Sequence, residues 1–146
     1  MNLTSCPDCG AVYTAVGDCC AARFDALLAL DHSRQEPWGS RHGQAFAAFA
    51  LQHPTAYAPS LDRAWAALHR IYVAGEAPAR VFGALVASRA APAQWRTPPR
   101  PPRPVRAPPV TIADLADVAA VTYPARLDVW CRASLVAWGA VLPPVT

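Results

Sequence analysis

Four of the five cysteines lie within the first twenty residues, in a pattern typical of a metal site. Cys6 and Cys9 begin and end a Cys-x-x-Cys turn, and Gly10 follows directly. In such a turn two thiolates converge on one ion, backbone amides donate to the sulfurs, and the glycine relieves the strained backbone. A thioredoxin-like redox pair needs a strand before the motif and a helix through it, which this context does not favour. Zn2+ is therefore the ion predicted to bind Cys6 and Cys9.

A structural zinc site needs two more ligands, and Cys19 and Cys20 compete for the third position. Both lie where a helix is expected to begin, and the free amides and the dipole of a helix start favour a thiolate. Cys20 shares an apolar stripe with Phe24 and so faces the body of the protein, whereas Cys19 lies on the side of Arg23. Cys20 is the favoured ligand and Cys19 the alternate.

The fourth ligand is expected to be a histidine, and helix geometry favours His53 over His42. If helices over residues 19–30 and 39–52 form an antiparallel hairpin, the start of the first lies beside the end of the second, which brings His53 near Cys20. His42 lies about 16 Å away along the second helix, so both histidines cannot bind one ion. His42 remains the alternate ligand, but a core position with ring nitrogens bonded to backbone is favoured for it. Two histidines are expected at the surface: His32 and His69.

The segments that position these residues are rich in alanine and carry helical spacing of large apolar side chains, with sixteen prolines between them. The fold class is therefore predicted as all-α, a small bundle of five to six helices after an N-terminal zinc-knuckle turn. Asp18 is the expected N-cap of the first helix, and Thr111 with Asp114 forms a variant capping box. The expected helices cover residues 19–30, 39–52, 60–75, 78–91, 111–118 and 124–141. The last helix has one apolar stripe: Leu127, Trp130, Ser134, Trp138 and Val141.

Residues 92–110 are rich in proline and arginine and are predicted to form an exposed linker before the last two helices. Arg100, Arg103 and Arg106 recur every third residue, which is the period of a polyproline II helix. Their guanidinium groups would then line one edge that an acidic protein partner could bind. A solvated spacer kept soluble by its charge is the favoured interpretation.

Length and composition predict one domain over residues 1–146, whose residues 1–20 form the metal-binding segment. The net charge of +3 and the 16% of charged residues give no reason to expect a polyanionic partner. The longest apolar stretch, 133–145, is interrupted by prolines and is shorter than the roughly 20 residues of a membrane span. The N-terminus has no basic start or apolar run typical of an export signal, so a cytoplasmic location with reduced thiols is expected.

The metal-binding motifs and the last helix also carry a family resemblance. Its N-terminal part consists of Cys6-Pro7-Asp8-Cys9-Gly10, Cys20 with Phe24, His42, and Leu51-Gln52-His53-Pro54. Its C-terminal part consists of Trp95, Pro98, Pro99, Thr111, Asp114, Trp130, Ser134 and Trp138. Together they resemble the bacterial family called domain of unknown function 5946, over nearly the whole chain. The resemblance implies that the family pattern singles out five positions, which suits three thiolates and one histidine: Cys6, Cys9, Cys20, His42 and His53. It implies no activity.

The leading functional hypothesis is a zinc-binding helical domain in which the metal is mainly structural and which acts through protein contacts. The alternative is a small zinc-thiolate metalloenzyme with three protein ligands and a bound water, in which His42 or Glu36 is the acid or base. Three sulfur ligands donate much charge and acidify that water less than histidines do, so the sequence leans against an enzyme. Nucleic-acid binding is the least favoured class, since the chain has neither interleaved aromatics nor a basic helix.

Overall fold

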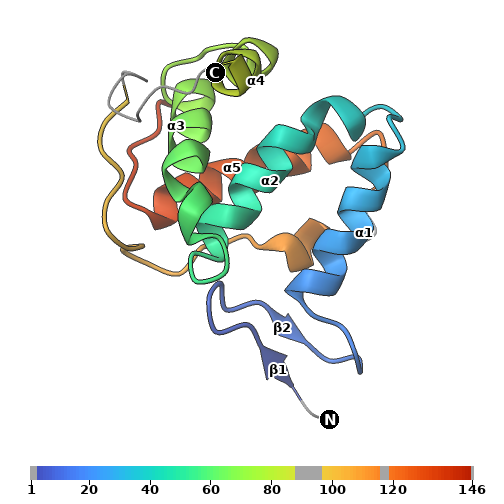
Figure 1. Ribbon diagram of the computed structural model, residues 1–146. Coiled ribbons are helices and arrows are strands. Elements are labelled where there is room, and N and C mark those ends of the chain that lie inside the picture. The colour runs from blue at the N-terminus through green and yellow to red at the C-terminus, as the bar shows by residue number, and fades with distance from the viewer. Residues whose placement is uncertain (1–2, 88–96, 116–118, 146) are drawn as a thin grey trace.

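The computed structural model describes residues 3–87, 97–115 and 119–145, and these are mainly helical, as the sequence predicted (Figure 1). Two short strands come first: β1 Thr4–Ser5 and β2 Val12–Tyr13. The α-helices of the described residues are α1 Cys20–His32, α2 His42–Gln52, α3 Leu61–Tyr72, α4 Pro78–Ala87 and α5 Tyr123–Ala137. Short 3-10 helices cover Gly39–Arg41, Ala58–Ser60 and Ile112–Leu115. Among the helices described, none combines the length and the apolar character that crossing a membrane requires.

The central helix of the fold is α2, which packs against both α3 and α5 (Figure 1). Its small residues Ala45, Ala48 and Ala50 are 0% exposed. Methyl side chains let the neighbouring helices approach closely, and a helix that is apolar around most of its circumference is typical of a core position. The alanine-rich sequence of α2 therefore suits the centre of the fold.

The predicted apolar stripe of α5 is confirmed over most of its length. Leu127, Trp130, Ser134 and Trp138 are each at most 1% exposed. The prediction is wrong for Val141, which is 87% exposed. The reason is that α5 ends at Ala137 and the chain then turns at Gly139, whose φ of +92° ends the helical spacing.

A buried amide joins the end of α2 to α5 and to the segment before the last two helices. Gln52 Nε2 donates to the carbonyl oxygen of Val110 at 2.7 Å and to Ser134 Oγ at 3.0 Å. Gln52 Oε1 accepts from Trp130 Nε1 at 3.1 Å. One residue further back, the Leu51 carbonyl accepts from Trp138 Nε1 at 2.8 Å. These bonds hold the last turn of α2 in one position, which matters because His53 follows it directly.

Helices α1 and α2 run antiparallel, as expected for the hairpin. Near one end of the pair, the rings of Phe24 and Phe49 stack with centroids 4.0 Å apart. At the other end, Asp31 of the last turn of α1 bonds to His42, the first residue of α2, at 3.0 Å. The start of α1 therefore lies beside the end of α2.

The described part of the proline-rich segment, residues 97–110, is attached to the helices rather than free in solvent. Trp65 Nε1 donates to the Pro98 carbonyl at 2.8 Å, and the amide of Val105 donates to the Ala137 carbonyl at 2.7 Å. Arg100 pairs with Asp62 at 2.9 Å and lies over the ring of Trp138. The three arginines therefore do not share one edge: Arg100 faces the helices, while Arg103 and Arg106 are exposed.

The capping box predicted at Thr111 is confirmed. The Thr111 amide donates to Asp114 Oδ2 at 2.9 Å, and Thr111 Oγ1 accepts from the Ala113 amide at 3.3 Å. The element that it opens is the 3-10 helix Ile112–Leu115 rather than an α-helix over that stretch. The rest of the helix expected over 111–118 lies outside the described residues.

Candidate metal centre

The Cys-x-x-Cys turn connects β1 and β2 (Figure 1). The Gly10 amide donates to the Cys6 carbonyl at 2.9 Å, and the Cys6 amide donates to the Ala11 carbonyl at 2.8 Å. Gly10 has a φ of +79°, a left-handed conformation that glycine adopts without a steric penalty. The strands were missing from the sequence prediction, because each has only two residues. Buried Ala11 and Tyr13 alternate with exposed Val12, but all three are apolar, so this alternation has no counterpart in the sequence.

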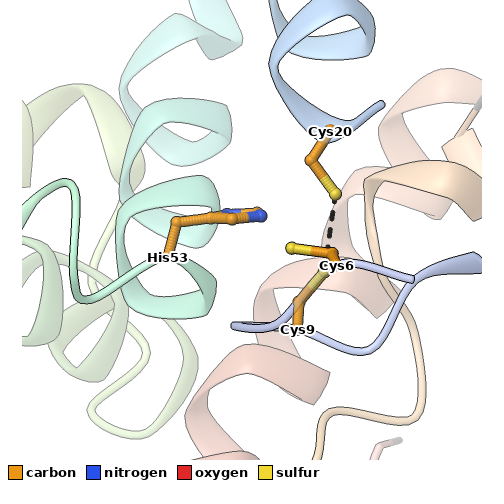
Figure 2. Close-up of side chains that lie close together, drawn as sticks. All are labelled: Cys6, Cys9, Cys20 and His53. Atoms are coloured by element: carbon orange, nitrogen blue, oxygen red, sulfur yellow. Dashed lines mark hydrogen bonds between the residues drawn. The ribbon is translucent and has the colours of Figure 1, made fainter. Parts of the chain in front are cut away.

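Three separate elements bring four side chains together. The turn supplies Cys6 and Cys9, the first residue of α1 is Cys20, and His53 is the C-cap of α2. One ligand atom from each residue lies within 4.8 Å of the ligand atoms of the others (Figure 2). We call these four residues the Cys3His cluster. A set of three thiols and one imidazole at this spacing could hold one metal ion.

The sulfur separation in the cluster matches ligands that share an ion and excludes a disulfide. Cys9 Sγ and Cys20 Sγ are 3.6 Å apart, and both thiols are free. A disulfide would place them about 2.05 Å apart. Two thiolates on one tetrahedral zinc, with zinc–sulfur bonds of about 2.3 Å, are roughly 3.8 Å apart. The observed distance is therefore close to that of a shared ion.

The His53 ring has one nitrogen bonded to the protein and one that points to the thiols (Figure 2). Nδ1 lies 2.9 Å from the Phe49 carbonyl and so carries the proton that it donates. Nε2 is buried and has no hydrogen-bond partner in the described part of the chain. Burial lowers the pKa of His53, which keeps the ring neutral. A neutral histidine that donates from one nitrogen to a carbonyl is the usual arrangement of a metal ligand.

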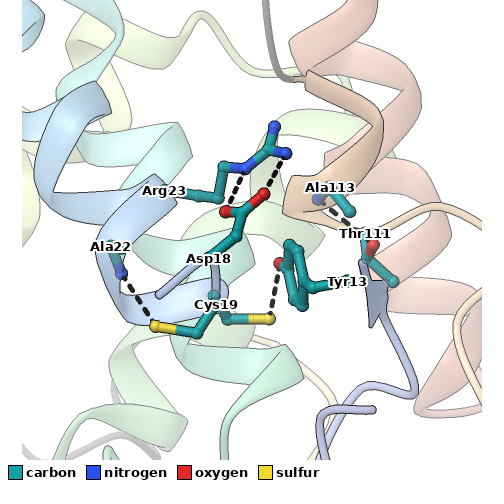
Figure 3. Close-up of polar contacts among 8 residues, drawn as sticks. Tyr13, Asp18, Cys19, Ala22, Arg23, Thr111 and Ala113 are labelled. Carbon is teal, nitrogen blue, oxygen red and sulfur yellow. Dashed lines mark hydrogen bonds and ion pairs between the residues drawn. The ribbon is translucent and has the colours of Figure 1, made fainter. Parts of the chain in front are cut away.

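The thiols of the cluster differ in their surroundings. Burial raises the pKa of Cys9 and of Cys20 above the ordinary thiol value of 9.0. At Cys6 burial also raises the pKa, but the backbone amides of Cys9 and Asp8 donate to its sulfur and leave the pKa below that value. The phenol of Tyr13 lies 3.0 Å from Cys20 Sγ (Figure 3). Tyr13 is a site residue that the sequence analysis missed.

Cys19, the alternate third ligand, lies outside the cluster and is exposed. Its sulfur is the N-cap of α1 and accepts from the Ala22 amide at 3.4 Å (Figure 3). The predicted N-cap, Asp18, is wrong, because its carboxylate forms a two-bond ion pair with Arg23. Cys20 lies in the cluster, on the inward side that helix spacing predicted, although the cap was placed one residue too early.

Replacing Cys19 with serine is expected to leave metal content unchanged and to raise the free energy of unfolding by about 0.5 kcal/mol. Serine is a better N-cap than cysteine, because its hydroxyl oxygen accepts a stronger hydrogen bond from the Ala22 amide. Chemical denaturation and metal analysis of the two proteins measure both quantities. A loss of bound metal in this variant would show that Cys19 is a ligand.

His42, the alternate fourth ligand, lies at the far end of α2 from the cluster. Its ring is 42% exposed, and Nδ1 bonds to the carboxylate of Asp31. The expectation of a core histidine bonded to backbone is therefore wrong. Asp31 is an acidic residue that the sequence analysis did not single out.

A hollow of about 360 Å³ opens beside the cluster. Cys6, Cys20 and His53 line one part of it, and Phe49 and Tyr57 give it an apolar wall. Asp8 also lines it, and Asp8 Oδ1 accepts from Thr55 Oγ1 at 3.1 Å, which links the turn to the loop after α2. Neither His42 nor Glu36, the proposed acid or base of an enzyme, is among the lining residues.

Comparison with known proteins identifies a family but no characterised relative. No curated protein and no solved structure matches the chain. The model of one family matches residues 4–139, a range that includes the whole Cys3His cluster. The chain belongs to this family, the family of unknown function DUF5946.

Proposed function

We propose that the Cys3His cluster binds one zinc ion as a closed structural site, and that the domain acts through protein contacts rather than catalysis. The observation that carries this proposal is the convergence of four donor atoms within 4.8 Å, one of them the Nε2 of His53, which has no hydrogen-bond partner among the described residues. Thiolate and imidazole are the ligands that structural zinc sites use, in Cys3His among other combinations. Four protein ligands complete a tetrahedron and leave no position for a substrate.

The ion would hold an otherwise weak part of the fold. Strands β1 and β2 have two residues each, and an isolated hairpin of this size is not stable in water. The hydrogen bond between Thr55 and Asp8 is exposed and contributes little by itself. A zinc ion bound by Cys6, Cys9, Cys20 and His53 would join the hairpin to both α1 and α2. The metal would therefore add to the few buried side chains of this segment, which are Cys9, Ala11 and Tyr13.

The proposal is tested by the metal content and the thermal stability of the reduced protein. Purified protein is expected to contain about one zinc per chain, measured by atomic emission, because the site has four donors for one ion. A strong chelator is expected to lower the unfolding temperature and to remove protection of the hairpin amides from hydrogen exchange. A protein that is free of metal and equally stable with and without the chelator would overturn the proposal.

Zinc binding is expected to strengthen as the pH rises. The raised pKa values of Cys9 and Cys20 mean that both thiols carry protons at neutral pH, and the ion must displace them. Without metal, the stability of the fold has the opposite pH dependence. The raised pKa of the Cys9 thiol favours the folded state below pH 9.0, and this contribution to stability is lost as the pH rises above that value. Calorimetry in buffers of different ionisation enthalpy should detect at least about two protons released per ion bound, those of Cys9 and Cys20.

The hollow beside the cluster is the one observation that favours a metalloenzyme, because a substrate in it would reach Cys6. An open coordination position would require one of the four donors to stay away from the ion, and all four lie together. The structural role is therefore better supported. X-ray absorption of the zinc-loaded protein separates the two: a structural site gives three sulfurs and one nitrogen, and in an open site an oxygen replaces one of these donors.

A further inference from the structure

A second cluster of metal-ligating side chains lies at the opposite end of α1 and α2. Asp31 and His32 are in the last turn of α1, and His42 is the first residue of α2. The antiparallel packing of the two helices brings the three residues together, although the two histidines are ten positions apart in the sequence. None of them lines the hollow beside the Cys3His cluster.

Asp31 holds one nitrogen of the His42 ring. The aspartate side chain is only 1% exposed, and its Oδ2 lies 3.0 Å from His42 Nδ1. A carboxylate accepts, so Nδ1 carries the proton and Nε2 keeps its lone pair. This arrangement of carboxylate, histidine and free Nε2 is the one that fixes ring orientation and raises the basicity of histidines that bind metals.

The second histidine lies at a distance that a shared ion permits. The ring centroids of His32 and His42 are 5.5 Å apart, and the rings are tilted by 44°. Two imidazoles on one tetrahedral ion, with metal–nitrogen bonds of about 2.1 Å, have centroids roughly 5 Å apart. An ordinary tilted contact of two rings has a similar spacing, as Trp65 and His69 show at 5.5 Å, so the separation permits a shared ion without requiring one. The His32 and His42 side chains are both accessible to an ion from solvent, since the first is exposed and the second is 42% exposed.

The local charges favour a cation at this end of the helices. Asp31 Oδ1 is buried without a hydrogen-bond partner in the described part of the chain, so its charge is only partly compensated. His32 lies at the C-terminus of α1, where the helix dipole attracts positive charge. The nearby cation Arg41 bonds to Glu36 and to the Pro37 carbonyl, and so does not compete for Asp31.

We propose that His32 and His42 bind a second divalent transition-metal ion, with Asp31 as the carboxylate behind His42. With two protein ligands the coordination sphere is open, and water or a donor group of a partner or small molecule completes it. The site therefore differs in kind from the Cys3His cluster: it exchanges its ion readily and presents it to the surroundings. It does not depend on the function proposed for the cluster, because it shares no ligand with it.

The experiment is a calorimetric titration of reduced protein that already holds one equivalent of zinc, with additional zinc as the probe. One further equivalent is expected to bind with lower affinity. His32→Gln is the main variant, since this residue is exposed and its loss does not threaten the fold. This variant is expected to lower the affinity for the second equivalent more than about 10-fold. Asp31→Asn should lower it about 10-fold or more, and both variants should leave the affinity for the first equivalent unchanged. His69 is half-buried against Trp65, contrary to the surface position expected from the sequence, and belongs to neither cluster, so His69→Gln is the control and should leave both equivalents unchanged.

Nitrogen chemical shifts of the histidine rings identify the ligands directly. The second equivalent is expected to shift Nε2 of His42 together with one ring nitrogen of His32, and to leave His69 unchanged. The proposal fails if no second equivalent binds to the zinc-loaded protein, or if His32→Gln binds it as the unchanged chain does. Absence of the first, tight equivalent would instead contradict the function proposed for the Cys3His cluster, so the two failures are distinguishable.

Discussion

Replacing Cys9 with serine is expected to abolish tight zinc binding and to lower the free energy of unfolding by at least about 4 kcal/mol at free zinc a thousand-fold above Kd. The reason is that Cys9 is buried at the centre of the Cys3His cluster, 3.6 Å from Cys20 Sγ. A serine hydroxyl does not ionise at neutral pH and cannot replace a thiolate ligand. For a chain of this length the unfolding temperature should fall by roughly 10–15 °C. Differential scanning calorimetry with metal analysis measures both effects.

Cys131→Ser is the matched control for that experiment. Cys131 is as buried as Cys9 but lies on α5, where its sulfur is 3.6 Å from the Gln44 carbonyl. This variant also exchanges a buried sulfur for oxygen, yet it should keep one zinc per chain and show the same response to a chelator as the unchanged protein. A Cys9→Ser protein that retained stoichiometric zinc would show that the ion is held elsewhere.

Gln52→Leu is expected to lower the free energy of unfolding by about 3 kcal/mol. Leucine fills a similar volume, but it removes the acceptor of Trp130 Nε1 and the donor to Ser134 Oγ and Val110. Trp130 is fully buried, so its N–H group loses its partner without gaining water. Urea denaturation should show a lower midpoint with an unchanged slope, because the exposed surface on unfolding stays the same.

Gln35→Leu is the control for Gln52, because Gln35 is exposed and the change should cost less than about 0.5 kcal/mol. Gln52 also precedes His53, so its bonds hold the C-cap of α2 in place. The Gln52 variant should therefore weaken zinc binding while the stoichiometry remains at one. Equal stability of the Gln52 and Gln35 variants would show that the buried amide bonds are not needed.

Helical periodicity alone led to much of the fold and of the candidate site. The spacing of Phe24 with Cys20 predicted which of two adjacent cysteines turns inward, and helix length predicted which histidine lies near it. Both inferences depend only on the geometry of a regular helix, which holds wherever the helix forms. The stripe on α5 was predictable for the same reason, up to the residue where the helix ends.

Features that depend on contacts between distant segments were not predictable in this way. The pairing of Asp31 with His42 arises because the last turn of α1 meets the first turn of α2, and neither residue has a local signal for it. Arg100 turns inward because Asp62 and Trp138 lie beside it in the folded chain, not because of its period in the sequence. The N-cap of α1 is Cys19 and not the predicted Asp18, because the Asp18 carboxylate is bonded to Arg23.

The methyl-lined centre of helix α2 also limits which substitutions the fold can accept. A flexible side chain can make room for a larger neighbour by changing rotamer, but Ala45, Ala48 and Ala50 have no rotamers to change. A larger side chain at any of these three positions would overlap the segments packed around α2, and such overpacking costs about 1–3 kcal/mol. The close packing around α2 therefore depends on small side chains at its centre.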